Sequence, residues 1–291
     1  MSKLSGSGQQ KKDKKESRPP SLLKKIRKKL RWLDPFTYVD EFVMPVVNPK
    51  KKSSIELVVN IFFAAFFAIA FYTIAGFLLS TEVPGAIVYS YSMVPVLSRG
   101  DFIAMQGVSA HNLNAETIDL NLAIANRPLK EYATTYCSFN EGYGNPDELK
   151  PCDDFLADFI YGKIKLDSFS TRKIAFRNGK TLDIKKSGDT VLYFSSLSGK
   201  QIIHRAVAKI NAEDGTFILT KGDSGKNPVI DQDYPLSYTN NAITFYATPA
   251  EKIKGRIFFT IPIIGYAKIL IFDDLPHLIF GCRQGEECYF P

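Results

Sequence analysis

The sequence predicts a mainly β domain that one amino-terminal helix anchors in a membrane. The first observation is the apolar run Leu57–Leu79, which has 23 residues, and no charged residue occurs from Leu57 to Thr81. At 1.5 Å per residue such a helix spans about 35 Å, enough to cross a hydrocarbon core of about 30 Å. The second observation is that residues 82–291 contain short runs rich in Val, Ile, Phe, Tyr and Thr, separated by Gly, Asn, Asp and Ser. This pattern is typical of β-strands joined by turns.

The positive charge of the chain is concentrated before this helix. Residues 1–52 contain 15 Lys or Arg and 5 Asp or Glu, a net charge of +10, so the chain's total of +7 leaves −3 for the rest. Because segments rich in Lys and Arg tend to stay in the cytoplasm, we expect a cytoplasmic tail over 1–54, a transmembrane helix over 55–81 and an extracytoplasmic domain over 82–291. The domain has no basic excess, and we expect it to bind no specific nucleic acid.

The tail is expected to contain an amphipathic helix of its own. Leucine and isoleucine recur at helical spacing between residues 22 and 33, among six Lys or Arg. This pattern is typical of a helix that lies on anionic lipid headgroups, so membrane lipids are expected partners. Docking to RNA or a ribosome is a second use for the same charge, and a merely solvated tail is a third.

All four cysteines follow the apolar run, which fits disulfide bonds in an oxidising exterior. Pairing over short range is the simplest of the three connectivities, Cys137 with Cys152 and Cys282 with Cys288. A zinc site is the alternative, but neither pair has C-x2-C spacing and only His111, His204 and His277 could assist. We therefore expect no metal and no cofactor.

The most informative segment lies about a dozen residues beyond the apolar run. It reads Ser90-Tyr-Ser-Met-Val-Pro-Val-Leu-Ser-Arg-Gly-Asp101. It resembles the first catalytic box of the type I signal peptidases, Ser-x-Ser-Met-x-Pro-x-Leu/Phe followed by Gly-Asp. The resemblance implies that Ser92 is the nucleophile and that Ser90, with the backbone N–H of Ser92, stabilises the oxyanion. Taken alone, a stretch of this composition could also be a turn that leads into a strand.

Further segments of the same family pattern follow in order. The segment Lys200-Gln-Ile-Ile-His-Arg-Ala-Val207 is similar to the histidine-bearing box of the archaeal and endoplasmic-reticulum branch, where bacterial relatives have a lysine base. The resemblance implies that His204 is the general base. Two more segments resemble family strands, Leu182–Phe194 with its Gly-Asp pair and Lys254–Tyr266 with its Ile-Pro-x-x-Gly-Tyr ending.

The acidic box Phe217–Asp233 resembles the family's Thr-Lys-Gly-Asp-Asn-Asn box with a downstream aspartate. Two residues are inserted after Asp223, so the downstream carboxylate is Asp231 or Asp233, and Asp231 fits better. The resemblance implies that Asp223 and Asp231 assist the base. The run from Asp231 to Asp233 would bind calcium only with other oxygen ligands.

Part of this site follows from strand pairing alone. Three strands joined by two hairpin turns are expected at 191–195, 201–210 and 216–220. If Ile210 lies opposite Thr216, antiparallel pairing places His204 opposite Gly222 and makes Asp223 a near neighbour of His204. A carboxylate there would fix the imidazole tautomer and stabilise the imidazolium.

We therefore expect a signal-peptidase-like β-sheet domain with a mixed insertion at about 109–174, an interval that is commonly much shorter in the family. The expected function is that of a membrane-bound serine endopeptidase, which removes signal peptides from exported precursors by acyl-enzyme hydrolysis. Precursor proteins and translocation machinery are its expected partners, in the cell membrane or endoplasmic-reticulum membrane. The alternative is a catalytically silent, membrane-anchored binding or scaffold subunit of a secretion complex, with the insertion as its partner surface.

Overall fold

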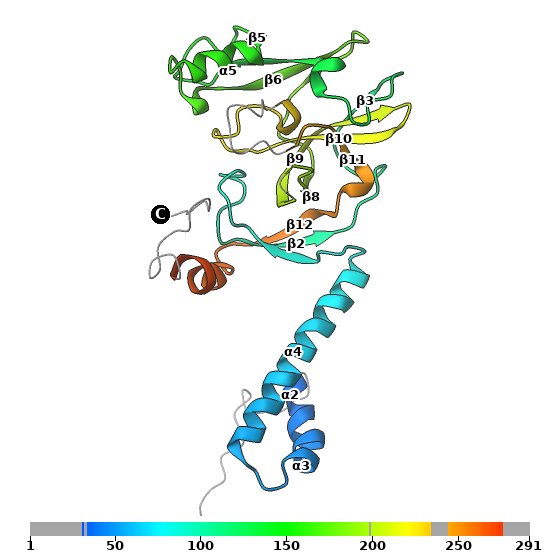
Figure 1. Ribbon diagram of the computed structural model, residues 1–291, viewed down its shortest axis with the longest axis vertical. Coiled ribbons are helices and arrows are strands. Elements are labelled where there is room, and N and C mark those ends of the chain that lie inside the picture. The colour runs from blue at the N-terminus through cyan, green and yellow to red at the C-terminus, as the bar shows by residue number, and fades with distance from the viewer. Residues whose placement is uncertain (1–30, 32–33, 198, 234–243, 276–291) are drawn as a thin grey trace, which may run out of the picture. The chain divides into compact units, whose positions relative to one another are not determined.

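The computed structural model describes residues 31, 34–197, 199–233 and 244–275, and the chain divides into two compact units at Tyr72 and Thr73. Figure 1 shows the helices of the amino-terminal part in blue and the β-strands of the second unit in cyan to orange. Each unit is described by itself.

The first unit contains three short helical segments and the greater part of a long helix. The segments are α2 (Pro35–Tyr38), η2 (Val39–Val43) and α3 (Met44–Val47), and α4 (Ser53–Leu78) follows. Asp34 caps α2 by accepting a hydrogen bond from the backbone N–H of Phe36 at 3.0 Å. The rings of Phe36 and Phe67 meet edge to face, with centroids 5.8 Å apart, so this helical segment packs on α4. The amphipathic helix predicted at 22–33 lies almost wholly outside the described residues.

Helix α4 corresponds to the predicted membrane helix. It is the one helix, among the residues that the structure describes, that is long and apolar enough to span a membrane, and only 6% of its most apolar window is buried. The predicted bounds were 55–81, whereas the helix is Ser53–Leu78. It ends early because Ser80 has a positive φ of 52° and the N–H of Thr81 turns back to the carbonyl of Gly76 at 3.0 Å, as at many helix ends.

The second unit is built on a mostly antiparallel sheet of eight strands. Along its main path the order is β1-β2-β12-β8-β9-β10-β11, and β3 pairs parallel to β9. The strand bounds are β1 Gly85–Ile87, β2 Phe102–Gln106, β3 Glu116–Asp119, β8 Thr190–Phe194, β9 Gln201–Ala212, β10 Gly215–Lys221, β11 Thr248–Pro249 and β12 Gly255–Ile261. Alternate side chains are buried, as Ile103 and Met105 are in β2, which is the pattern expected of sheet strands.

A second, four-stranded antiparallel sheet has the order β5-β4-β6-β7. Its strands are β4 Ala133–Phe139, β5 Lys150–Pro151, β6 Phe169–Phe176 and β7 Thr181–Asp183, and α5 (Cys152–Ile160) follows β5. Figure 1 shows this smaller sheet and α5 in green above β9 and β10. The two sheets share one hydrophobic core, to which the smaller sheet contributes Ile174 and Phe176 and the larger sheet Ile210 and Phe217.

The mixed region differs from the predicted insertion in its bounds. Strand β3 lies inside the predicted interval of 109–174 but belongs to the larger sheet, and the smaller sheet continues beyond that interval to β7. The segment beginning at Leu182, which was expected to belong to a strand of the catalytic sheet, contributes its first residues to β7 and enters the larger sheet only at Thr190. The predicted bounds assumed a separate cap, whereas the two sheets share one core and strands of both occur inside and outside the predicted interval.

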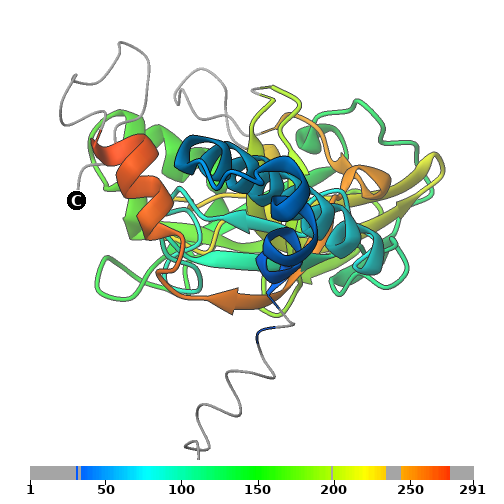
Figure 2. The same ribbon diagram turned by 90° about the horizontal axis from the view of Figure 1, so that it is seen from below.

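The remaining described elements are short helical turns. They are η3 (Leu129–Glu131), η4 (Leu166–Ser168), η5 (Asp231–Asp233), η6 (Ala250–Lys252), α6 (Tyr266–Ile269) and η7 (Leu270–Asp274). Figure 2 shows the chain leaving β12, drawn in orange, and continuing into the helical segment of α6 and η7.

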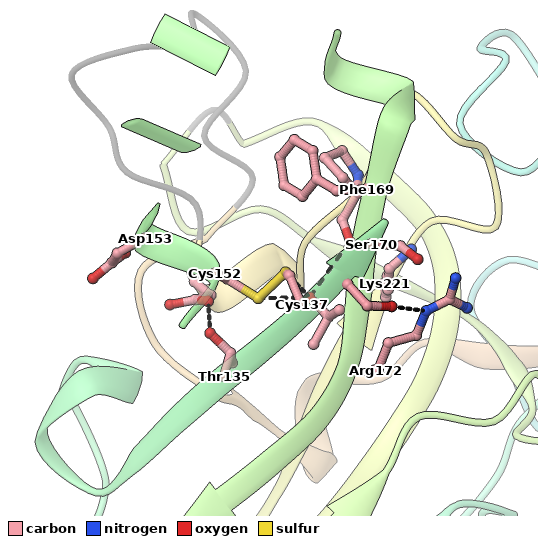
Figure 3. The surroundings of a disulfide bond; sticks show 12 residues. Thr135, Cys137, Cys152, Asp153, Phe169, Ser170, Arg172 and Lys221 are labelled. Carbon is pink, nitrogen blue, oxygen red and sulfur yellow. Dashed lines mark hydrogen bonds between the residues drawn. A yellow bond between two sulfur atoms is a disulfide. The ribbon is translucent and has the colours of Figure 1, made fainter. Parts of the chain in front are cut away.

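The short-range pairing predicted for Cys137 and Cys152 is confirmed. These residues form a disulfide bond between β4 and the first residue of α5 (Figure 3), with 4.8 Å between their Cα atoms. Both cysteines are buried with Phe155 and Phe169 in a cluster of their own. Cys282 and Cys288 lie outside the described residues.

Replacing Cys137 and Cys152 together with alanine is expected to lower the free energy of unfolding by about 3 kcal/mol, because the bond closes a loop of 15 residues in the unfolded chain. For a domain of this size that corresponds to a fall in Tm of roughly 6–12 °C. Thermal unfolding followed by circular dichroism measures it. Addition of a reductant to the unaltered protein should give the same fall, and equal Tm values in all samples would contradict the prediction.

Candidate active site

A buried histidine and aspartate form the centre of the candidate site. His204 lies in β9, and its Nδ1 is 2.7 Å from Oδ2 of Asp231 in η5. Both side chains are 2% exposed. The same oxygen of Asp231 accepts hydrogen bonds from the hydroxyl of Thr220 at 2.6 Å and from the hydroxyl of Tyr193 at 2.9 Å. The carboxylate is therefore fixed by three neighbours from β8, β9 and β10.

The surroundings of Asp231 favour its charged form. Burial by itself raises the pKa of this carboxyl, but His204 and the hydroxyls of Thr220 and Tyr193 outweigh burial and hold the pKa below its usual range. Burial, together with the nearby Asp231, raises the pKa of the Tyr193 hydroxyl well above its usual value, so this tyrosine remains a hydrogen-bond donor. The arrangement can hold a proton on Nδ1 of His204 and leave Nε2 as the basic nitrogen.

The Asp223 carboxylate does not take the role predicted for it, because the carboxylate bonded to His204 is that of Asp231. The Asp223 carboxylate instead forms a two-pronged ion pair with Arg205, with Nε–Oδ1 and Nη2–Oδ2 distances of 2.9 and 2.6 Å. The physical reason is that consecutive residues of a strand point to opposite faces of the sheet. Arg205 follows His204 directly, so a carboxylate on the Arg205 side cannot also contact the imidazole.

The predicted register between β9 and β10 is wrong by one residue near the turn that joins them. Towards the end of β10 the predicted register is correct. Ile210 lies opposite Phe217 rather than Thr216. Between Leu219 and Thr220 the register shifts, so that Val207 has no opposite residue and Lys221 pairs with Arg205. This β-bulge brings the continuation of β10, at Gly222, next to His204.

The segment that carries Ser92 lies against this same turn. The carbonyl oxygen of Ser92 accepts a hydrogen bond from the backbone N–H of Ser224 at 2.9 Å. A Cβ atom on Gly222 would lie 2.7 Å from that oxygen, so glycine is needed for the close approach. Met93 and Leu97, buried in the core under β2, hold the segment from the other side. No hydrogen bond joins Ser92 to His204 among the contacts of the described residues.

Ser90 lies beside the predicted nucleophile, and its Oγ is 3.1 Å from Oγ of Ser92. If Ser90 donates to the oxyanion, Ser90→Ala should lower kcat by roughly 10²-fold, because one donor to the transition state is lost. Ser90→Thr, which keeps the hydroxyl, should retain most of the activity. Cleavage kinetics with a purified precursor measure both, and an unchanged kcat for Ser90→Ala would remove Ser90 from the oxyanion site.

The structure separates the two downstream aspartates, of which the sequence favoured Asp231. Asp231 contacts His204, whereas Asp233 accepts a hydrogen bond from the hydroxyl of Thr135 in β4. Asp233 is buried, and burial raises its pKa to about 6. Around neutral pH it is therefore mostly a buried carboxylate whose charge depends on the Thr135 donor.

Three contributors to the site were not predicted from the sequence. Tyr193 and Thr220 bind the Asp231 carboxylate, as described above. The Nζ of Lys221 donates to the carbonyl oxygens of Gly222 at 3.0 Å and Asn227 at 2.7 Å, and burial lowers its pKa to about 8. Lys221 belongs to the Thr-Lys-Gly-Asp motif, so its place in the acidic box was the available signal. Within the described residues no group of three His, Cys, Asp or Glu side chains could hold a metal ion.

No protein-family model matches this chain, and no curated protein has a matching sequence. The resemblance to signal peptidases therefore rests on the motifs and their order along the chain, to which the geometry of the candidate site is added.

Proposed function

We propose that this chain is a membrane-anchored serine endopeptidase that removes signal peptides from exported precursor proteins. The observation that carries the proposal is the buried pair of His204 and Asp231, next to a turn that contacts the backbone of Ser92. A buried imidazole whose Nδ1 meets a carboxylate is the arrangement that a serine hydrolase uses for its base. The family-like box around Ser92 supplies the matching nucleophile.

In the proposed reaction, Oγ of Ser92 attacks the scissile carbonyl and its proton passes to Nε2 of His204. The imidazolium, stabilised by Asp231, then gives the proton to the leaving amine, and an acyl-enzyme ester on Ser92 remains. Water activated by His204 hydrolyses this ester and restores the serine. The hydroxyl of Ser90 and the N–H of Ser92 would stabilise the oxyanion. A hydrogen bond between base and nucleophile often tightens only when substrate is bound.

The link between the end of α4 and the larger sheet supports cleavage close to a membrane. The carbonyl of Leu79, directly after α4, accepts a hydrogen bond from the N–H of Gly107 at 2.8 Å. The hydroxyl of Thr81 donates to the carbonyl of Lys254 at 2.6 Å. Only 12 residues separate Leu79 from Ser92, so even an extended connection would keep Ser92 within about 45 Å of the helix end.

We infer a cytoplasmic amino terminus from the basic tail, with the β domain on the opposite side of the membrane.

The test is cleavage of a signal-bearing precursor by the full chain, purified in detergent and supplied with lipid. A single cut after a small residue, located by sequencing the new amino terminus, is the expected result. Precursor whose signal peptide has been deleted is the control and should stay intact. If folded protein cuts none of several precursors, the proposal fails, and a binding or scaffold subunit becomes the better interpretation.

A further inference from the structure

The segment from Pro228 to Asp233, which carries Asp231, is fastened to the smaller sheet on both sides of that aspartate. Before it, the N–H of Thr171 in β6 donates to the carbonyl of Pro228 at 2.8 Å. Val229, which is 1% exposed, packs into the cluster around the disulfide bond. After it, Asp233 accepts the hydrogen bond from Thr135 in β4.

The larger sheet holds the same segment in a different way. Gln232 accepts a hydrogen bond from the backbone N–H of Thr220 at 3.0 Å through its Oε1, and Thr220 and Tyr193 bind the Asp231 carboxylate itself. These contacts orient side chains along the edge of β10. The smaller sheet, in contrast, holds the backbone before Asp231 at Pro228 and the side chain of Asp233 after it.

We propose that the smaller sheet is a positioning element for Asp231, and that Thr135 is the positioning residue through which β4 holds Asp233 and keeps Asp231 against His204. The effect on catalysis rests on the proposed function, whereas the effect on the contact between Asp231 and His204 does not. The predicted insertion would thus serve the proposed active site directly, not as a partner surface.

The physical basis is the cost of leaving Asp233 without its donor. A buried carboxylate that loses its hydrogen bond is strongly penalised, so it takes up a proton or moves towards water, and in either case the bond that ties this end of the turn to β4 is lost. Asp233 is two residues from Asp231 in the same helical turn, so its movement would pull Asp231 away from the imidazole. Figure 3 shows Thr135 on the same strand as Cys137, so the disulfide and this hydrogen bond fasten one strand.

The experiment compares Thr135→Val, which removes the hydroxyl, with Thr135→Ser, which keeps it. Ser138→Ala is the matched control, because Ser138 is a fully buried residue of β4 whose hydroxyl donates to the carbonyl of Phe139 and accepts from Nε of Arg172. Two properties of the full chain are measured: kcat for precursor cleavage, and the far-downfield proton resonance expected from the short hydrogen bond at Nδ1 of His204. Its disappearance in His204→Ala assigns that resonance.

For Thr135→Val we expect the resonance to be lost or broadened. We also expect kcat to fall by about 10- to 100-fold, because small displacements of catalytic groups cause losses of that size. A smaller fraction of folded protein would lower kcat but would not remove the resonance from the molecules that remain folded. Thr135→Ser should restore both properties, and Ser138→Ala should match the unaltered protein.

Val229→Ala tests the other attachment of the segment independently, and it should weaken the resonance in the same way. It therefore supplies the test if Thr135→Val fails to fold. An unchanged resonance in the folded variants would overturn the positioning proposal, as would loss of the resonance in Ser138→Ala to the same extent. If Thr135→Val loses the resonance but the unaltered protein cuts no precursor, positioning is supported and the proposed function fails.

Discussion

Ser92→Ala is expected to abolish precursor cleavage without disturbing the fold. Removing the nucleophile of a serine protease lowers kcat by on the order of 10⁶-fold, which leaves only residual activity. The fold should survive because Ser92 holds its place through its backbone carbonyl, bonded to the N–H of Ser224, and this contact is unchanged in alanine. Among the residues that the structure describes, the one hydrogen bond of the Ser92 side chain is with the hydroxyl of Ser90.

The measurement is kcat with a defined precursor, together with thermal unfolding to show equal stability. Ser98→Ala is the matched control, since Ser98 is an exposed serine of the same segment. Ser98→Ala should cleave the precursor as the unaltered protein is expected to. Cleavage at the normal rate and site by folded Ser92→Ala would exclude Ser92 as the nucleophile and with it the proposed mechanism.

Asp231→Asn is expected to lower kcat by roughly 10⁴-fold, because an amide beside Nδ1 favours the wrong imidazole tautomer and cannot stabilise the imidazolium. Asp223→Asn should act differently. It weakens the ion pair with Arg205, in which the side chains of Asp223 and Arg205 are only 3% and 12% exposed. Weakening a buried pair leaves a charge poorly compensated, so unfolding should become easier by up to about 3 kcal/mol.

The comparison therefore separates catalysis from stability. Activity is measured per folded molecule, at a temperature where both variants remain folded, and stability is measured by thermal unfolding. We expect Asp231→Asn to lose the greater part of its activity and Asp223→Asn the greater part of its stability. Equal losses of activity per folded molecule would mean that both carboxylates act on the base, as the resemblance implies.

The strands of the larger sheet were predictable because alternating apolar residues and hairpin turns are local features. The strands expected at 191–195, 201–210 and 216–220 correspond to β8, β9 and β10, with ends that differ by one or two residues. Their detailed register was not predictable. The bulge at Val207 depends on how both faces of β9 pack, since Ala206 belongs to one hydrophobic cluster and Ala208 to another.

The bulge also affects the candidate site. Unbroken alternation from Ile210 would place His204 on the face that packs against the smaller sheet. The extra residue at Val207 turns His204 to the other face, where Tyr193 and Thr220 complete the surroundings of Asp231. Tyr193 could not be assigned to the site from sequence, because it lies in a strand that looks like ordinary core. Thr220 begins the Thr-Lys-Gly-Asp motif, but the motif by itself gave its hydroxyl no role.

The sequence by itself determined the apolar membrane-length helix and the mainly β character of the domain. These follow from run length and alternation, which are properties of neighbouring residues. The pairing of Cys137 with Cys152 was the simplest of three connectivities, and most of the candidate site residues came from the resemblance of ordered motifs to a known family. Only the tertiary structure decided that Asp231 faces His204 while Asp223 pairs with Arg205, and that the smaller sheet holds the Asp231 segment. Those outcomes depend on which face of a strand each side chain occupies and on contacts between residues far apart in the chain, where a shift of one residue exchanges the two faces.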